Sequence, residues 1–302
     1  MRKSFADTML EVGQKDPKLV VLIGDISHFI LQPFAKACPG RFYNVGICEP
    51  TIVSMGAGLS HAGLYPVIHT IAPFIVERSF EQIKLDFCYH GLGGNLISVG
   101  SAFDYSGLGC SHHCYDDLAL VKTLPGTEVI YPATQKEFNI LFKQTYDDGK
   151  LTYFRLPATK HNIEIKESDI EFGRAVKIKE GKDYTIIVTG PQLQTVMDSM
   201  EELEKIGMDI EVLYVHTLKP FDEKSILQSV NKTKKFLVIE EHSKFGGLGD
   251  EVIRSVHGSG LYKSDFINIP DNFIRNYGHY NEHRNALGMS KENIIKIIKN
   301  NL

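Results

Sequence analysis

The chain has 302 residues, of which 43% are hydrophobic and 23% are charged, and its formal net charge is −4. This composition is typical of a globular protein that buries a core, and the length favours two domains over one. Because the charge is weakly negative and no block of like charge occurs, we expect neither nucleic acid nor an anionic membrane as a partner.

The N-terminal sequence and the cysteines bear on the compartment in which we expect the protein to occur. Asp7 and Glu11 interrupt the stretch where a signal peptide would need an apolar core, and no apolar run approaches membrane-spanning length. The five cysteines are scattered and odd in number, so they do not form a disulfide framework. We therefore expect a cytoplasmic protein.

In the first half of the chain, apolar runs alternate with amphipathic stretches. The pattern predicts buried parallel strands and, between them, crossover helices. The predicted strands are 19–23, 66–70, 95–99 and 128–131, and the predicted helices are 4–14, 51–62, 74–88 and 135–147. This alternation is typical of a doubly wound α/β domain.

The same pattern begins again after a polar segment at 161–171. Strands are predicted at 184–189, 211–214 and 236–239, and a helix is predicted at 192–207. We therefore expect two doubly wound α/β domains, residues 1–165 and a smaller one at 166–302.

The segment YNVGICEP, residues 43–50, places Glu49 between an apolar strand and a helix rich in alanine and glycine. One explanation is structural, because a carboxylate is favoured at a helix N-terminus and Pro50 suits the first helical position. The next residues, TIVSMGAGLSHAG, are small enough to let a helix approach a neighbouring backbone closely. Such an approach is also what a cofactor or subunit interface requires.

Two further segments carry chemistry. HTIAPFIVERSFEQIKLD contains two phenylalanines that spacing alone would assign to the core. GSAFDYSGLGCSHHCYDDLA is a Gly/Ser-rich loop that follows a predicted parallel strand and contains two histidines. A metal site is an alternative for this loop, although four ligands within five residues strain tetrahedral geometry; its ligands would be Cys110, His112, His113 and Cys114.

Together these segments resemble the glutamate, aromatic and histidine motifs of transketolases, a family of thiamine-diphosphate enzymes. The resemblance implies that Glu49 contacts the aminopyrimidine and promotes ylide formation, and that Phe74 stacks on that ring. It places Arg78 and Phe80 at the pocket, although Arg78 could equally form a surface or interface ion pair. It also places His112 beside the reacting carbon, where an imidazole can relay a proton.

Asp25, in VLIGDI, corresponds to the acidic residue that the family keeps near the cofactor and the dimer interface. A helix cap or a satisfied loop carboxylate is the alternative for this residue. In the second half, KDYTIIVTG, VLYVHTLKPFD and VIEEHSKFGGLGDEV look like the family's C-terminal domain. The similarity thus extends over essentially the whole chain.

One family motif is absent from the sequence. The chain lacks the Gly-Asp-Gly, followed some thirty residues later by Asn, that binds magnesium and diphosphate in these enzymes. The resemblance then implies that this chain supplies only the pyrimidine side of the site, with no metal ligand of its own. A separate N-terminal transketolase subunit would hold Mg²⁺ and the diphosphate, in an α2β2 heterotetramer in which this chain also self-associates.

The sequence departs from the sugar-phosphate transketolases at the acceptor site. Phe29, Gly100 and Ala158 stand where the family keeps Ser, His and Arg, and Leu108 replaces an Asp that reads an acceptor hydroxyl. Loss of these donors disfavours an ordinary pentose or erythrose phosphate as acceptor. A modified or nucleotide-linked sugar is one hypothesis, with a polar pocket rebuilt from His28, Asp104 and Arg155.

The resemblance therefore implies a transketolase-type transferase that moves a two-carbon ketol unit from a ketose donor to an aldehyde or ketone acceptor. Two alternatives remain open at this point. The chain could be the β subunit of a thiamine-diphosphate-dependent 2-oxo-acid dehydrogenase, which has the same two-domain plan, or a non-catalytic subunit with a degenerate site.

Overall fold

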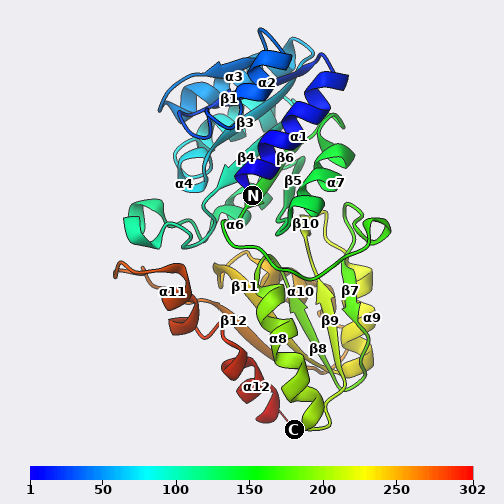
Figure 1. Ribbon diagram of the computed structural model, residues 1–302. Coiled ribbons are helices and arrows are strands. Elements are labelled where there is room, and N and C mark those ends of the chain that lie inside the picture. The colour runs from blue at the N-terminus through cyan, green and yellow to red at the C-terminus, as the bar shows by residue number, and fades with distance from the viewer. Residues whose placement is uncertain (302) are drawn as a thin grey trace.

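Two β-sheets organise the chain, and Figure 1 shows them as two lobes stacked along the long axis of the molecule. The structure is a computed structural model and describes residues 1–301. The first sheet has the strand order β10-β5-β6-β4-β3-β1-β2, and the second has the order β12-β11-β8-β9-β7. All pairings are parallel except those of β10 with β5 and β7 with β9 at the sheet edges. The predicted fold class, with two doubly wound α/β domains, is confirmed.

The strands of the first sheet are β1 (Leu19–Ile23), β2 (Phe42–Asn44), β3 (Tyr65–Ile71), β4 (Gly94–Val99), β5 (Thr127–Ile130), β6 (Leu151–Leu156) and β10 (Thr217–Lys219). Those of the second are β7 (Val176–Lys179), β8 (Tyr184–Val188), β9 (Ile210–Tyr214), β11 (Lys235–Ser243) and β12 (Lys263–Ile269). The helices are α1 (Arg2–Lys15), α2 (Gln32–Ala37), α3 (Glu49–His61), α4 (Ala72–Ile75), α5 (Phe80–Gln82), α6 (Asp117–Lys122), α7 (Gln135–Thr145), α8 (Gln192–Lys205), α9 (Glu223–Thr233), α10 (Leu248–Val256), α11 (Tyr280–Ala286) and α12 (Lys291–Lys299). A π-helical turn η1 (Ile83–Tyr89) and the 3-10 turns η2 (Ser106–Leu108), η3 (Cys110–His112) and η4 (Glu167–Asp169) complete the described structure.

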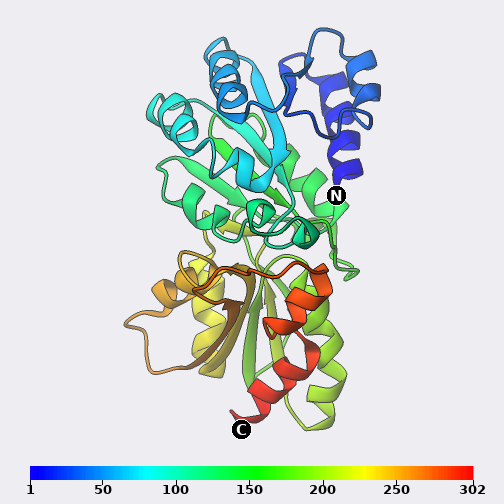
Figure 2. The same cartoon turned by 90° about the vertical axis from the view of Figure 1, so that its left-hand side faces the viewer.

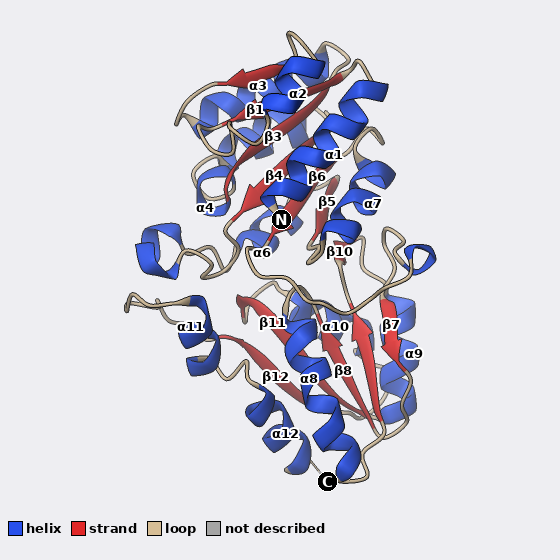
Figure 3. Cartoon of the chain, in the orientation of Figure 1, coloured by secondary structure: helices blue, strands red, loops and turns tan. Residues whose placement is uncertain are grey.

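Helices cover both faces of each sheet (Figure 3), because alternate residues of a strand point to opposite sides. In the first lobe, Val21 and Ile23 belong to the apolar cluster that includes α1, α2 and α7. Leu22, between them, belongs to the cluster that includes α3, η1 and α6. In the second lobe, α8 and α12 contribute to the former cluster, and α9 and α10 to the latter. Both apolar clusters thus extend through the two lobes.

The prediction of one continuous helix at 74–88 is wrong, because the structure interrupts this segment. The structure has α4 up to Ile75, a turn, and then α5, which continues as the π-helical turn η1. The buried hydroxyl of Ser79 donates to the carbonyl oxygen of Phe74 at 3.2 Å, so a side chain takes a backbone acceptor at the break. π-Helical turns of this kind occur often at functional sites.

The two lobes are joined by a strand from the second half of the chain that belongs to the first sheet, which the sequence pattern did not indicate. β10, from the second half of the chain, pairs with β5 and so completes the sheet of the first lobe. The ammonium group of Lys219 donates to the carbonyl oxygen of Leu124 at 2.6 Å and to that of Lys122 at 3.0 Å. Figure 2 shows the same junction from the side. Among the described residues, no helix is both long enough and apolar enough to cross a bilayer.

Candidate active site

The predicted site residues follow the carboxyl ends of neighbouring parallel strands. Asp25 follows β1, Glu49 follows β2, Phe74 follows β3, and His112 lies in the loop after β4. Because parallel strands end at the same edge of a sheet, these residues share one edge. Doubly wound folds place ligands at that edge.

Glu49 is the first residue of α3, and its side chain is only 2% exposed. Its Oε2 accepts a hydrogen bond from Nη1 of Arg78 at 2.7 Å. Its Oε1 accepts no hydrogen bond from any described residue. The carboxylate is therefore held by one cation and keeps one oxygen for a further donor.

A series of side-chain contacts leads from this carboxylate to Arg78, Phe74 and His112. The guanidinium carbon of Arg78 lies 4.3 Å from the ring centroid of Phe74. The ring of His112 meets the ring of Phe74 edge-on, with centroids 5.2 Å apart. An unbroken series of contacts therefore links Glu49, Arg78, Phe74 and His112, although they come from three separate segments.

Among the small residues of α3, Gly56 packs closely on side chains of the same chain, whereas a Cβ atom on Gly58 would meet nothing within 4 Å. A Cβ atom on Gly56 would lie 2.5 Å from Cδ1 of Ile68 on β3, closer than real Cβ contacts come. A larger residue at position 56 would therefore require the side chain of Ile68 to shift. This close packing fixes the start of α3 and with it Glu49.

The loop that carries His112 leaves β4 at Gly100 and is closed by a hydrogen bond from the backbone N of Cys114 to the carbonyl oxygen of Ala102, at 2.8 Å. Gly100 has a φ of +79°, and a Cβ atom there would lie 2.2 Å from Cε2 of Tyr105. The family's histidine cannot occupy position 100 unless Tyr105 moves.

Tyr105 is a site residue that sequence reasoning missed. Its ring centroid lies 6.2 Å from that of His112, and its hydroxyl accepts a hydrogen bond from Arg2. The signal was present, because a tyrosine five residues after a glycine that replaces a family histidine can fill the vacated space. The close approach of Tyr105 to Gly100 depends on the conformation of the loop after β4, which the sequence does not specify.

The remaining predicted residues lie nearby with other partners. Asp25 is exposed, has a φ of 57°, and exchanges hydrogen bonds with Asn44, whose amide nitrogen lies 2.9 Å from Oδ1 of Asp25. The ring of His28 lies against that of Phe29, with centroids 4.0 Å apart. Phe80 is half-buried and packs against the apolar cluster behind α3.

Asp104 has a role within its own loop. Oδ2 of Asp104 accepts hydrogen bonds from the backbone N of Ser101 and of Ala158, both at 2.9 Å. Burial raises the pKa of Asp104 to about 7. The carboxyl therefore ties the start of the loop to the end of β6.

Arg155, predicted to help form a polar substrate pocket, lies in the interior of the protein. It is 0% exposed, and its guanidinium donates to the carbonyl oxygens of Glu241 and Cys114, each at 2.9 Å. Its Nε lies 3.1 Å from Oδ2 of Asp117, which is also fully buried. The structure gives Arg155 no surface for a substrate, so its predicted role in a polar pocket is wrong.

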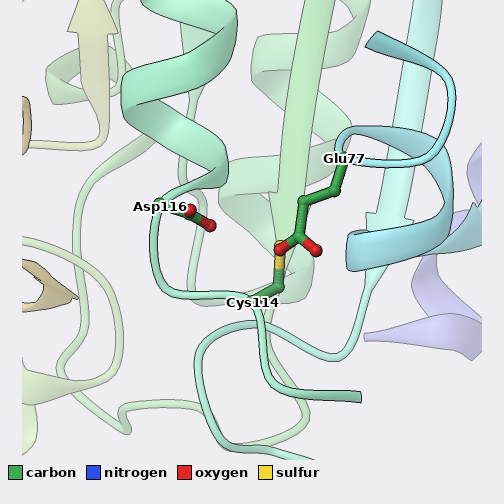
Figure 4. A group of neighbouring side chains, drawn as sticks. All are labelled: Glu77, Cys114 and Asp116. Atoms are coloured by element: carbon green, nitrogen blue, oxygen red, sulfur yellow. The ribbon is translucent and has the colours of Figure 1, made fainter. Parts of the chain in front are cut away.

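One group of three potential metal ligands occurs among the described residues. Glu77, Cys114 and Asp116 have ligand atoms within 4.8 Å of one another. Figure 4 shows the three side chains as neighbours. Burial and the neighbouring Asp116 raise the pKa of Glu77 to about 7, and burial raises the pKa of the Cys114 thiol. A protonated thiol is a poor metal ligand, so we read the trio as a hydrogen-bonded cluster. The alternative site at Cys110, His112, His113 and Cys114 is not gathered, and all five cysteines are free thiols.

The residues present fit the pyrimidine side of thiamine diphosphate. The guanidinium of Arg78 lies over the ring of Phe74, so a pyrimidine would contact this ring beside the cation or in its place. The free Oε1 of Glu49 is available for a ring nitrogen. A buried carboxylate with one unused oxygen beside an aromatic face is the arrangement that a protonated heterocycle needs.

Family models give the class to which this fold and this site belong. The model for the transketolase pyrimidine-binding domain matches residues 1–162, and the model for the transketolase C-terminal domain matches residues 173–294. The chain therefore belongs to the transketolase family. The alternative of a 2-oxo-acid dehydrogenase β subunit is not favoured.

Individual relatives define the similarity further. The chain is 32% identical to one subunit of the apulose-4-phosphate transketolase of Phocaeicola vulgatus, over 98% of this chain and 95% of that protein. It is 31% identical to the 6-deoxy-6-sulfo-D-fructose transketolase subunit SqwH of a Clostridium species, over 82% and 78% of the two chains. A solved structure described as a split gene transketolase, inactive beta4 tetramer, superposes with a TM-score of 0.87 at 29% identity, covering 99% of this chain and 96% of that one.

Proposed function

We propose that this chain is the subunit of a two-chain transketolase that supplies the pyrimidine side of the thiamine diphosphate site. A partner chain would hold Mg²⁺ and the diphosphate. The observation that carries this proposal is the buried Glu49, linked through Arg78 and Phe74 to His112, in a chain without the diphosphate motif. The domain division at residue 165 is part of the same proposal.

When bound, thiamine diphosphate supplies a carbon nucleophile and an electron sink for breaking and making a carbon–carbon bond. Glu49 would hold a proton at the pyrimidine nitrogen that faces its free Oε1. Its burial strengthens that hydrogen bond, because water does not screen it. Phe74 would orient the ring by contact with its face.

His112 would exchange a proton with an oxygen of the substrate. Its Nδ1 lies 3.0 Å from the hydroxyl of Ser111, which fixes the orientation of the ring. Its Nε2 makes no hydrogen bond with a described residue and is therefore the atom for the substrate. The edge contact with Phe74 holds the imidazole beside the ring that would contact the pyrimidine.

The proposed assembly is an α2β2 heterotetramer in which this chain also contacts a second copy of itself. Two relatives carry the word subunit in their names, and the similar solved chain forms a β4 tetramer described as inactive. Phe29 and Ile47, near the site, are 79% and 73% exposed, which suits a surface that another chain covers. The cytoplasmic location stays a prediction.

We further propose a non-standard sugar acceptor. The relatives are named for apulose 4-phosphate and for a sulfonated deoxyfructose, which are uncommon ketoses, so their names support a non-standard sugar substrate in general. The close approach of Tyr105 to Gly100 supports the same view, because it removes the position of one family phosphate donor.

Reconstitution with the partner subunit tests the proposal. We expect the chain alone to show neither turnover nor tight thiamine diphosphate binding, and the mixture to show both in the presence of Mg²⁺. Glu49→Gln should lower the turnover number at least about a hundredfold while the far-UV spectrum stays unchanged. Glu81→Gln, an exposed carboxylate of α5, is the matched control. Unimpaired turnover of Glu49→Gln would refute the assignment.

A further inference from the structure

We propose that His113 and His283 form a binding site for a phosphate-like oxyanion, where the loop of His112 meets the second lobe. His113 follows His112 in the chain, and His283 lies on α11. Identifying the anion as the end group of a sugar substrate rests on the proposed function, whereas the binding itself does not.

The two side chains are buried and face each other. His113 is 4% exposed and His283 is 2% exposed. Their ring centroids are 5.8 Å apart, and the ring planes meet at 75°. Neither ring nitrogen of His113, and not Nε2 of His283, bonds to a described residue. A buried polar atom without a partner costs about 1–3 kcal/mol, so a ligand that satisfies these nitrogens is favoured.

His283 also lines a cavity of about 680 Å³. Asn272, Arg275 and Asn276 contribute polar groups to its wall, and Phe273 and Ile274 contribute apolar surface. No carboxylate of a described residue forms an ion pair with Arg275. The wall thus combines one unpaired guanidinium, two amides and an imidazole, which are donors suited to an oxyanion.

The segment that contributes most of the cavity wall packs against the loop of the first lobe. The segment between β12 and α11 runs beside turns η2 and η3 in Figures 1 and 2. A Cβ atom on Gly109 would lie 2.8 Å from the ring of Tyr277, so this contact is close. Since adjacent Cα atoms are about 3.8 Å apart, His113 brings the anion site next to His112.

The side chains around the pair form no metal-ligand group among the described residues, which favours an anion over a metal cation. His112 and Tyr115 face His113 from its own loop, and Glu282, on α11, accepts a hydrogen bond from the backbone N of His279 at 2.8 Å. No three-ligand group among the described residues includes either histidine. The two rings are in edge-to-face contact, so an oxyanion would bond to their free ring nitrogens from beside the pair, at about 2.8 Å.

The protonation of His113 should respond to the ligand. Burial, His283 and His112 lower the pKa of His113 in the free chain. A bound oxyanion stabilises the imidazolium form and so raises that pKa. Binding should therefore take up protons and tighten as the pH falls from 8 towards 6.

The site would replace the donors that the acceptor pocket lacks. Phe29 and Ala158 occupy two positions where sugar-phosphate transketolases keep a polar or cationic group. In this chain the cation, Arg275, lies instead in the segment before α11, and the two imidazoles lie on α11 and in the loop of His112. The substrate class is accordingly a sugar that ends in a phosphate or a sulfonate.

Histidine-detected NMR of the full chain, titrated with inorganic phosphate, tests the binding. We expect saturable chemical-shift changes of His113 and His283 and a higher pKa for His113. His113→Gln and His283→Gln should each weaken binding about tenfold or more. His257→Gln, an exposed histidine after α10, is the control and should bind as the wild type. Equal affinity in all three variants, or no saturable shift, would overturn the site.

A second measurement identifies the source of the anion. In the assembled enzyme, inorganic phosphate should inhibit competitively against the acceptor and lose this effect in His283→Gln. Noncompetitive inhibition would overturn the assignment to the substrate and identify a free regulatory anion. A positive NMR titration without any transketolase turnover would refute the proposed function and leave the anion site standing.

Discussion

Replacing Arg155 with methionine removes the cation at the centre of the junction between the lobes. Its guanidinium lies 3.1 Å from Asp117, donates to the carbonyl oxygens of Glu241 and Cys114, and covers the ring of Tyr131 at 4.7 Å. Methionine fills most of the space but bonds to none of these groups. Asp117 would remain buried without its counter-ion.

The size of the effect follows from that burial. Both Arg155 and Asp117 are 0% exposed. Removing one partner of a buried ion pair costs about 3–5 kcal/mol, a large share of the roughly 5–15 kcal/mol that stabilises a typical protein. At about 2–4 °C per kcal/mol, the midpoint of thermal unfolding should fall by roughly 6–20 °C.

Urea denaturation followed by far-UV circular dichroism measures this loss, since the chain has no tryptophan to report by fluorescence. The double variant Arg155→Met/Asp117→Leu should be more stable than Arg155→Met alone, because the unpaired charge is gone. Arg174→Met, which loses a half-exposed pair with Asp222 at 3.7 Å, is the control and should cost at most about 1 kcal/mol. A loss of less than about 1 kcal/mol for Arg155→Met, or a double variant no better than the single one, would refute the reasoning.

Three other predictions concern the loop, the pH and the cofactor. Gly100→Ala should destabilise the chain more than Gly40→Ala in urea, because both have positive φ but only the first Cβ meets a neighbour, 2.2 Å away; equal losses would contradict this. Burial raises the pKa of Glu240 to about 7 from 4.5, so the folded chain keeps a proton that the unfolded chain releases. Stability should therefore fall by up to about 3 kcal/mol as the pH rises from 4.5 to 7, and Glu240→Gln should flatten this part of the curve; a curve that keeps the wild-type slope counts against the assignment. Phe74→Ala should weaken thiamine diphosphate binding to the assembled enzyme about five- to tenfold by calorimetry, whereas Phe74→Tyr should not, and equal affinities would remove Phe74 from the site.

The sequence predicted what depends on local pattern. The alternation of apolar runs and amphipathic stretches indicated the doubly wound fold, and Pro50 after Glu49 indicated the start of α3. The order of the motifs placed Glu49, Phe74 and His112 after successive strands, which is enough to gather them at one edge of a parallel sheet.

The sequence could not predict features that depend on distant partners. β6 was missed because Thr152 and Arg155 interrupt its apolar run, and both are buried only because Glu128 and Asp117 satisfy them. β10 was missed because a three-residue strand has no periodicity to detect. Arg155 was misassigned for the same reason, since its partners lie in other segments.

The geometry of the junction assigns the second lobe a part in the site. Arg155 of β6 links the loop of His112 to the second lobe, because its guanidinium donates both to Cys114 of the loop and to Glu241 of β11. Tyr277 packs against Gly109 of the same loop, and β10 completes the sheet from which the loop emerges. Removing the second lobe would therefore expose an edge of β5 and release the support of His112 together. The two domains do not form separable structural and catalytic units, because the polar groups that fix the loop belong to both.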